Sequence, residues 1–562
     1  MKNSNSFILV AGVIAVLIMA SCRSKNVYPN PALNQIELLR GDIILCSGKD
    51  FGDVDFAMSC DYSVRETFEL AISLLHSFEY DEAEKAFVQV IDADPNCAMA
   101  YWGVAMSIYH ALWEPPGPEQ LKKGEKILQI AATIPKTERE EEYLAAVGEY
   151  YHHWENTDPK TRAKKMADKM EAIYLKYPDD NEAAVLYALA LNTTADPADQ
   201  NFTNQRKAGS ILESLFSDHP NHPGIAHYII HNYDNPVLAS KALATARKYA
   251  QIAPASAHAQ HMPSHIFTRL GLWDESIESN LNSIASAVCY ADQAGFNAHW
   301  DEELHGMDYI VYAYLQRGNN GQAAAQNDYL NTFEKVYPVN FKVAYAMAAI
   351  PARMVLENKD WKSAANLTLP PINFPWEQFP WQVGILHFTR ALGAAHTGDL
   401  KAAYSELAHL DTFQAKLTRA NNTYQANQVM IQSLAAKGWI KWAEGNFQEA
   451  LSLMQDAAIR EDQTTKHPVT PCEVLPAREL LADLLLAIDR PEQALMAYQM
   501  DLNTHPNRLN GLYGAAVCAL KLNDTEAAKS FYQKLLSLAG DEANERSEIA
   551  EASDYLVTHE KR

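Results

Sequence analysis

The sequence predicts an all-α protein, an α-solenoid in which helical hairpins stack side by side in two halves. Past Tyr62, apolar residues recur at three- and four-residue spacing, as on one face of a helix, and the alternating stretches typical of strands are few. Prolines that close successive units, such as Pro220 and Pro254, lie 34 residues apart, which is a known length of a helix-turn-helix repeat. A unit of this size buries its apolar face only against its neighbours, so we expect the units to stack.

Composition and charge narrow the classes of function. The chain has 562 residues, 48% of them apolar, with 23 Gly and 26 Pro, which excludes a disordered or collagen-like polymer. The 70 acidic residues outnumber the 47 basic ones and give a formal net charge of −23. Such a charge repels nucleic acid, and no run of Lys and Arg forms a local basic patch. We therefore expect no nucleic-acid partner.

The N-terminal residues 1–22 have the features of an export signal. Lys2 supplies a positive charge, and residues 7–20 form an apolar stretch too short to span a bilayer comfortably as a helix. Small residues then lead to Cys22. This stretch resembles a bacterial lipoprotein signal peptide with its lipobox. The resemblance implies a mature protein that begins at a lipidated Cys22, whereas simple secretion after cleavage nearby is the alternative.

The same resemblance places the protein in the cell envelope. It implies attachment to a membrane through the lipid on Cys22, with a polar tether that starts at Arg23. Because Arg rather than Asp follows Cys22, the resemblance favours the outer membrane, with the protein facing the periplasm.

Export implies an oxidising compartment, in which disulfides persist. Cys46 and Cys60 are close in sequence, and we expect a disulfide between them that closes a short loop within the segment 23–62. The remaining cysteines fall in helical patterns, where a small buried apolar residue is the expected role; they are Cys97, Cys289, Cys472 and Cys518.

A short signature recurs at the turn between two helices, with copies at residues 78–83, 271–276, 398–403 and 445–450. A Gly often ends the first helix, an aromatic residue packs across the turn, an acidic residue favours the start of the second helix, and an Ala lets the helices approach. On this signature and the proline spacing, the chain resembles the tetratricopeptide repeat family over residues 63–540. Together with the lipobox, it resembles the exported tetratricopeptide lipoproteins of Gram-negative bacteria.

The resemblance implies a concave groove, lined by the first helix of each hairpin, that binds a protein or peptide ligand. Residues 368–381 are rich in Pro and Trp, interrupt the helical pattern and predict a connection between two solenoids. The N-terminal solenoid then spans residues 63–367, and the C-terminal solenoid spans residues 382–558.

Two histidine pairs occupy matching positions of neighbouring units. His227 and His231 precede His261 and His265 by 34 residues. Residues at i and i+4 share one face of a helix, and neighbouring helices pack about 8–10 Å apart. By the resemblance, these positions face the groove. We therefore expect the four imidazoles to meet between two helices.

Imidazole groups in this arrangement suit a transition-metal ion. Further candidate ligands are His258, Asp234, His305 and Asp308. Nitrogen-rich sites favour zinc, whereas the thioether of Met262 suits copper. The sequence does not choose between the two metals.

Pro263 affects how the second histidine pair is presented. Proline is tolerated in the first turn of a helix but removes a hydrogen bond from a helix interior. If Pro263 begins a helix, His258 and His261 precede it in a non-helical approach.

Three further side chains, those of Arg269, Tyr312 and Arg353, are expected in the groove, where an arginine can bind a carboxylate through a forked contact. Enzyme chemistry stays open, because a histidine can act as a general acid or base near neutral pH. The chain contains no His-Glu-X-X-His string, no phosphate-binding Gly-rich loop and no Cys-X-X-Cys motif.

The sequence leaves three interpretations of the histidine cluster. The main prediction is a cell-envelope lipoprotein whose groove binds a protein, a peptide or another ligand such as a glycan, without a metal. The alternative is a metal-binding protein or metal-dependent enzyme that uses the cluster. In the third interpretation, the histidines only pack between repeats of a structural envelope protein.

Overall fold

The computed structural model describes four stretches of the chain, residues 29–46, 50–112, 115–539 and 546–559. The predicted signal peptide, residues 1–22, and the predicted lipidation site, Cys22, lie outside them. Among the helices described, none has the length and apolar character that crossing a bilayer requires.

The described residues are mainly helical, as the sequence predicts. The first helices are α2 (Arg65–His76), α3 (Tyr80–Ala93), α4 (Ala98–Ile108), α5 (Pro118–Ala132), α6 (Glu138–Tyr151), α7 (Pro159–Lys176), α8 (Asn181–Thr193) and α9 (Thr203–Phe216). The middle helices are α10 (Pro223–Tyr233), α11 (Ala239–Ile252), α12 (Ala257–His261), α13 (Pro263–Leu270), α14 (Trp273–Ala294), α15 (Asp301–Gln316), α16 (Asn320–Leu330), α17 (Phe341–Glu357) and α18 (Trp361–Ala365). The last helices are α19 (Pro380–Thr397), α20 (Leu400–Arg419), α21 (Thr423–Ala443), α22 (Phe447–Asp462), α23 (Ala477–Ala487), α24 (Pro491–Thr504), α25 (Leu509–Lys521), α26 (Thr525–Leu538) and α27 (Ser547–His559).

Shorter elements connect these helices. Two strands of two residues each, β1 (His299–Trp300) and β2 (Val336–Tyr337), pair in parallel. The 3-10 helices are η1 (Pro31–Gln35), η2 (Tyr62–Val64), η3 (Trp154–Asn156) and η4 (Trp376–Gln378).

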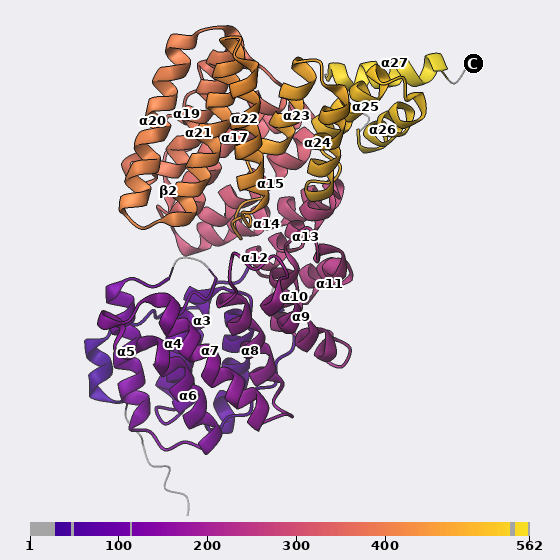
Figure 1. Cartoon of the computed structure of the whole chain (residues 1–562). Helices are drawn as coiled ribbons and strands as arrows, with labels where there is room; N and C mark the ends of the chain where they lie inside the picture. Colours follow the sequence, from indigo (N-terminus) through magenta and orange to yellow (C-terminus); the bar gives the residue numbers. More distant parts are fainter. Residues whose placement is uncertain (1–28, 47–49, 113–114, 540–545, 560–562) are drawn as a thin grey trace, which may run out of the picture.

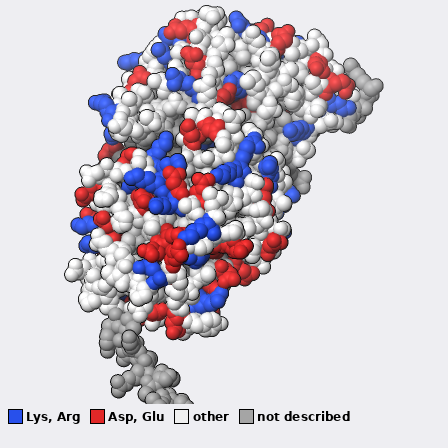
Figure 2. All heavy atoms as spheres, turned by 60° about the horizontal axis from the view of Figure 1, so that its bottom comes forward, with Lys and Arg blue, Asp and Glu red and all other residues white. Residues whose placement is uncertain are grey.

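The hairpins stack into a curved array (Figure 1). Each helix packs mainly against the next one or two helices along the chain, as in α14 with α15 or α19 with α20. Helices far apart in the sequence also meet, because α10 contacts α2, and α15 contacts α25. On the face drawn in Figure 2, basic and acidic side chains are interspersed.

The turn at Gly271 shows how the predicted signature works. Gly271 ends α13 with φ at 65°, a left-handed conformation that Gly adopts without strain. A Cβ at this position would lie 2.4 Å from the carbonyl oxygen of Pro506, so a larger residue does not fit. The amide of Asn507 donates to Gly271 O at 3.0 Å, and the indole of Trp273 donates to Asn507 O at 3.0 Å. The turn therefore fastens the middle of the chain to its C-terminal part.

The predicted connection, residues 368–381, is packed between two apolar clusters. Phe374 belongs to one cluster and Trp381 to the other. The Trp381 ring lies 5.4 Å from the ring of Phe341 and 5.3 Å from that of Tyr345, measured between centroids. Its aromatic residues thus fill space between helices, while the domain boundary itself stays a prediction.

The disulfides differ from the sequence prediction. Cys46 is bonded to Cys289, and Cys60 is bonded to Cys97, so the predicted bridge between Cys46 and Cys60 is wrong. Cys97 and Cys289 are consequently half-cystines and not the buried apolar residues that their helical surroundings suggest.

The path of the N-terminal segment explains this pairing. The segment runs along the helices, and its backbone N–H groups are bound by buried carboxylates at separate points. Leu39 donates to Glu84 at 2.8 Å, Ile44 donates to Glu82 at 2.8 Å, and Ser59 donates to Glu140 at 2.7 Å. An extended segment held in this way keeps its two cysteines apart and presents each to a different helix. The other two cysteines, Cys472 and Cys518, are buried and form no disulfide, as expected.

Candidate metal centre

The predicted histidine pairs are carried by neighbouring helices. His227 and His231 lie on α10, and His265 lies on α13. His261 is the last residue of α12, a short helix whose N-terminus is capped by the side chain of Ser256. Within each pair the rings share one face, with centroids 4.7 Å apart in the first pair and 4.9 Å apart in the second.

Pro263 is the first residue of α13, where proline is tolerated, in agreement with the sequence analysis. The residues before it differ from expectation. His258 and His261 lie in the five-residue helix α12 rather than in a non-helical approach, because the Ser256 cap starts a separate helical turn before Pro263.

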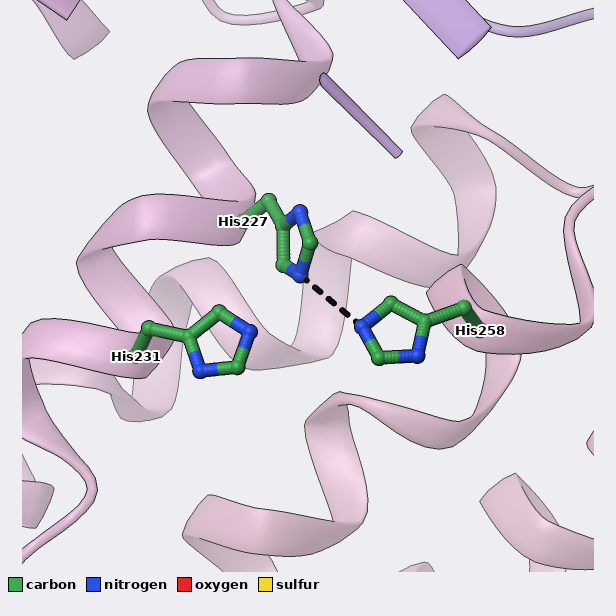
Figure 3. Close-up of side chains that lie close together, drawn as sticks. All are labelled: His227, His231 and His258. Atoms are coloured by element: carbon green, nitrogen blue, oxygen red, sulfur yellow. Dashed lines mark hydrogen bonds between the residues drawn. The ribbon is translucent and has the colours of Figure 1, made fainter. Parts of the chain in front are cut away.

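Three histidines form the first triad, namely His227, His231 and His258 (Figure 3). Each ring offers one nitrogen, and these nitrogens all lie within 4.8 Å of one another. All three side chains are buried. Across the gap between α10 and α12, the Nε2 atoms of His227 and His258 are 3.2 Å apart.

The second triad consists of His261, His265 and His305, which is contributed by α15. Its ligand nitrogens also lie within 4.8 Å of one another, and all three side chains are buried. The ring centroids of His261 and His305 are 4.1 Å apart. Tyr309, one turn after His305, stands edge-on to His261 with centroids 4.6 Å apart.

The two triads lie side by side. The ring centroids of His231 and His265 are 6.3 Å apart, and those of His258 and His261 are 6.4 Å apart. The histidine pairs therefore meet between neighbouring units, as their 34-residue offset predicts. They are buried rather than spread along an open groove, because none of these side chains is more than 9% exposed, and of the six only His231 borders a cleft.

Hydrogen-bond partners fix the proton positions on two of the rings. Asn280 Nδ2 donates to Ser276 O at 2.7 Å, which turns Asn280 Oδ1 toward Nδ1 of His261, 2.6 Å away. His261 Nδ1 therefore carries a hydrogen. His265 Nδ1 lies 2.9 Å from Asp234 Oδ2. An ionised carboxylate only accepts, so His265 Nδ1 carries a hydrogen as well.

As a result, two nitrogens without hydrogens face each other. His261 Nε2 and His265 Nε2 are 2.9 Å apart, yet neither neutral ring has a hydrogen left to donate between them. Burial, aided by the neighbouring His265, lowers the pKa of His261 well below its usual value. Burial also lowers the pKa of His265 to about 4, although Asp234 opposes the change. A shared proton is therefore disfavoured at neutral pH.

A metal ion removes this conflict. Both Nε2 atoms would bind it through the electron pairs that otherwise repel each other. A tetrahedral ion with metal–nitrogen bonds of ~2.0–2.1 Å holds its nitrogen ligands about 3.3 Å apart. The observed separation of 2.9 Å between the Nε2 atoms of His261 and His265 needs only a small rotation of either ring to match.

The first triad carries a weaker signal. His227 Nδ1 donates to the backbone oxygen of His76 at 2.6 Å, so its Nε2 is unprotonated in the neutral ring. His258 Nε2 lies 3.2 Å away and can donate to it. This contact is thus an ordinary hydrogen bond without an ion, unlike the contact between His261 and His265.

A third cluster, which the sequence does not reveal, consists of His76, Glu182 and His222. His222 Nδ1 accepts from the backbone N–H of Ile225 at 3.2 Å, so its Nε2 donates to Glu182 Oε1 at 2.9 Å. His76 Nε2 lies 2.9 Å from Glu182 Oε2, and its Nδ1 lies 3.0 Å from the hydroxyl of Tyr228. Every ring nitrogen has a partner, so this cluster is complete without an ion. No local spacing joins residues so far apart in the sequence.

Asp234, a predicted candidate ligand, acts on the second triad through His265. Its carboxylate also accepts from Arg269 Nε at 3.0 Å and from Lys466 Nζ at 2.9 Å. Burial alone would raise the pKa of Asp234, but Lys466 and Arg269 outweigh burial and hold it well below its usual value. Asp234 therefore stays ionised and orients the His265 ring, as a carboxylate behind a metal-bound histidine does.

Three other predicted site residues lie elsewhere. Arg353 is fully buried and donates to Asp308 at 3.1 Å, so neither the ligand role of Asp308 nor the groove role of Arg353 is correct. Tyr312 is also buried, and its hydroxyl accepts from Arg508 at 3.1 Å. These residues form a charged network within the core, because their helices pack more closely than an open groove requires.

A cleft with a volume of about 580 Å³ opens beside the first triad. One wall comes from residues 192–237 and the other from residues 461–505, and Arg269 lies between them. His231 also lines this cleft. Acidic side chains outnumber basic ones around it, seven to three. A ligand from solvent would therefore come within reach of the histidines here.

The C-terminal part of the chain matches a known family. Residues 509–542 match the family model described as "Tetratricopeptide repeat", and helices α25 and α26 form the corresponding hairpin. No curated protein matches the chain.

Two solved structures are similar to this chain. One is described as the crystal structure of the yeast Tom70, with 12% sequence identity, a TM-score of 0.33, and coverage of 89% of this chain and 96% of that chain. The other is a monomeric mutant of IFIT1 with m7Gppp-AAAA, with 12% identity, a TM-score of 0.33, and coverage of 86% and 96%. Residues 509–542 are thus a tetratricopeptide repeat, and the other described helices stack in sequence as helical hairpins do.

Proposed function

We propose that this tetratricopeptide repeat protein binds transition-metal ions at its two histidine triads. The observation that supports the proposal most strongly is the distance of 2.9 Å between the Nε2 atoms of His261 and His265, whose Nδ1 atoms both donate elsewhere. In a structural packing role, the two nitrogens would still face each other, with only the Tyr309 hydroxyl, 3.3 Å from His265 Nε2, able to donate to one of them. Ions at the triads convert this contact into coordination.

Zinc and copper are the metals that the donor set fits best. Three neutral imidazoles are a known ligand set of catalytic zinc, which keeps a further position open. Imidazole also suits copper, and Met262, whose side chain lines a small cavity between the triads, would favour the reduced ion. Water or a substrate would take the open position.

The proposed location is the cell envelope, with a lipid anchor at Cys22 in the outer membrane and the folded part in the periplasm. The N-terminal sequence supports export, and the bridges of Cys46 with Cys289 and of Cys60 with Cys97 fit an oxidising compartment. Replacing Cys22 with Ser should move the protein from the membrane fraction to the soluble periplasmic fraction. Retention in the membrane fraction would contradict the anchor.

A second candidate function is capture of a protein or peptide segment in the cleft between residues 192–237 and 461–505. The excess of acidic side chains there favours a basic segment. Fluorescence anisotropy with two labelled decapeptides, one rich in Lys and one rich in Glu, tests this. Binding of the Lys-rich peptide alone, weakened by salt, is the expected result, and equal binding of both would oppose it.

Metal analysis of protein purified without a His tag tests the main proposal. The wild-type protein, loaded with zinc or copper and then desalted, should retain stoichiometric metal, whereas the double variant His261→Ala with His265→Ala should lose the ion of the second triad. A matched control replaces His387 and His409, whose rings also lie close together, 4.3 Å apart, but outside the triads.

Circular dichroism separates loss of the site from loss of the fold. If the double alanine variant is unfolded, the milder His305→Gln variant takes its place and should lower the metal affinity of a folded protein. Wild-type protein that retains no metal, or variants that retain as much as the control, would overturn the proposal.

A further inference from the structure

We infer that the two triads form one dinuclear centre, in which two ions share a small anionic bridging ligand such as hydroxide. This inference rests on the proposed metal binding and goes beyond it, because two separate mononuclear sites would satisfy that proposal equally well. The step from two sites to one centre depends on the space between the triads.

A small cavity lies at the junction of the triads. It is lined by His231 and His258 of the first triad and by His265 and His305 of the second. Its volume is about 10 Å³, which is close to the minimum that holds one water molecule, about 10–15 Å³. The space therefore admits a ligand of one or two atoms and excludes larger ones.

The separation of the triads suits two ions that share a ligand. The rings that face each other across the junction have centroids 6.3 Å apart for His231 and His265 and 6.4 Å apart for His258 and His261. In proteins, paired ions that bind a common ligand lie roughly 3.5–4 Å apart. The two triads are therefore adjacent, as a ligand shared by two ions requires.

Charge balance identifies the bridging ligand as an anion. Two divalent ions bound only by neutral imidazoles would bury several positive charges without compensation, which is very costly. The nearby carboxylates compensate only part of this charge. Asp234 is paired with both Arg269 and Lys466. Glu302, which also lines the cavity, shares Lys342 with Asp301 and leaves at most one negative charge for the ions. An exogenous anion between the ions supplies the missing charge.

His231 offers the route by which this anion would enter. It is the one triad histidine that lines both the small cavity and the cleft. A small anion from the cleft therefore reaches the junction by passing the His231 ring. Larger ligands stay in the cleft, next to the centre.

Copper(II) is a suitable probe, because the spins of two copper ions couple when the ions share a bridging ligand. The tag-free protein should bind two copper ions per chain. Its electron paramagnetic resonance signal should account for only a small fraction of the bound copper, because bridged spins couple.

Breaking one triad should separate the spins. The His258→Ala variant should bind one copper ion per chain and show a full mononuclear signal, whereas the His387→Ala with His409→Ala control should behave like the wild type. If His258→Ala does not fold, as judged by circular dichroism, His258→Gln replaces it.

The copper experiments separate the dinuclear centre from the metal binding on which it rests. Protein that binds no copper would overturn both. Two bound ions with a full, uncoupled signal would overturn the dinuclear centre but leave metal binding in place. A single ion per wild-type chain, bound by histidines of both triads, would also overturn the dinuclear centre but leave metal binding in place.

Discussion

Lys466 Nζ lies 2.9 Å from Asp234 Oδ2, although 232 residues separate them in the sequence. The same carboxylate oxygen accepts from His265 Nδ1 at 2.9 Å. A loop from the C-terminal part of the chain therefore helps to position a histidine of the second triad, and the candidate centre depends on contacts between distant repeats.

Replacing Asp234 with Asn should weaken metal binding without removing a ligand. The amide is a poorer acceptor for His265 Nδ1, so the ring loses orientation and basicity, and such changes typically lower metal affinity by about 10–100-fold. Competition with a chelator of known affinity measures the Kd. The control is Asp196→Asn, which changes an acidic residue of the same cleft that binds only a local backbone N–H. An unchanged Kd in Asp234→Asn would show that the carboxylate does not support the centre.

Replacing Arg353 with Leu should destabilise the fold and leave metal content unchanged. Arg353 and Asp308 are almost completely buried, and removing one partner of such a pair costs about 3–5 kcal/mol because the other charge is left unpaired. Chemical denaturation measures the loss. The exposed pair of Arg40 and Asp92 offers a matched control, and Arg40→Leu should cost less than about 1 kcal/mol. A loss of metal in the folded Arg353→Leu protein would indicate that Asp308 is a metal ligand.

His505 should stabilise the protein most at mildly acidic pH. Burial opposes its protonation, but Asp501 and Glu473, at 2.9 and 3.0 Å, raise the pKa of His505 well above its ordinary value of 6.5. A raised folded-state pKa gives stability that is complete below pH 6.5 and is lost as the pH rises through the folded-state value. The difference in thermal midpoint between wild type and His505→Asn should therefore shrink above pH 6.5.

His396 provides the opposite case for comparison. Burial lowers its pKa to about 4, so it is neutral in both folded and unfolded chains above its ordinary value of 6.5. The difference between wild type and His396→Asn should stay constant above that pH. A parallel, constant difference for His505→Asn would show that His505 is not held in its charged form.

The disulfide pattern has a direct chemical test. Proteolysis of the unreduced protein should release a peptide pair that contains Cys46 and Cys289 and another that contains Cys60 and Cys97, identified by mass spectrometry. A fragment with Cys46 joined to Cys60 would contradict the structure. Replacing Cys289 with Ser should cost about 2–5 kcal/mol, as is typical when a native disulfide is removed.

The part of the centre that follows from a local period could be predicted from the sequence. The 34-residue repeat places His227 and His231 in register with His261 and His265, and the structure brings these pairs together. Helical spacing also indicated the all-α fold. The register of the histidine pairs and the all-α fold both depend on interactions within a helix or between neighbouring hairpins. The spacing of residues along the chain indicates such interactions.

The remaining features depend on how distant segments pack, and local spacing does not record that. Asn280 fixes the proton on His261 from the adjacent helix α14, and Lys466 approaches from the C-terminal part of the chain. Proximity in the sequence was misleading for Cys46, because carboxylates on the helices hold the N-terminal segment extended and bring Cys46 to Cys289 instead of Cys60. The burial of the triads likewise depends on helix α15 and on the loop that carries Lys466.

Diffraction from crystals of the tag-free, zinc-loaded protein, recorded at the zinc absorption edge, tests the central claim most directly. The account predicts an anomalous peak about 2.0–2.1 Å from both His261 Nε2 and His265 Nε2. Zinc-loaded crystals with no anomalous density at either triad, and with the two rings still in contact, would contradict it.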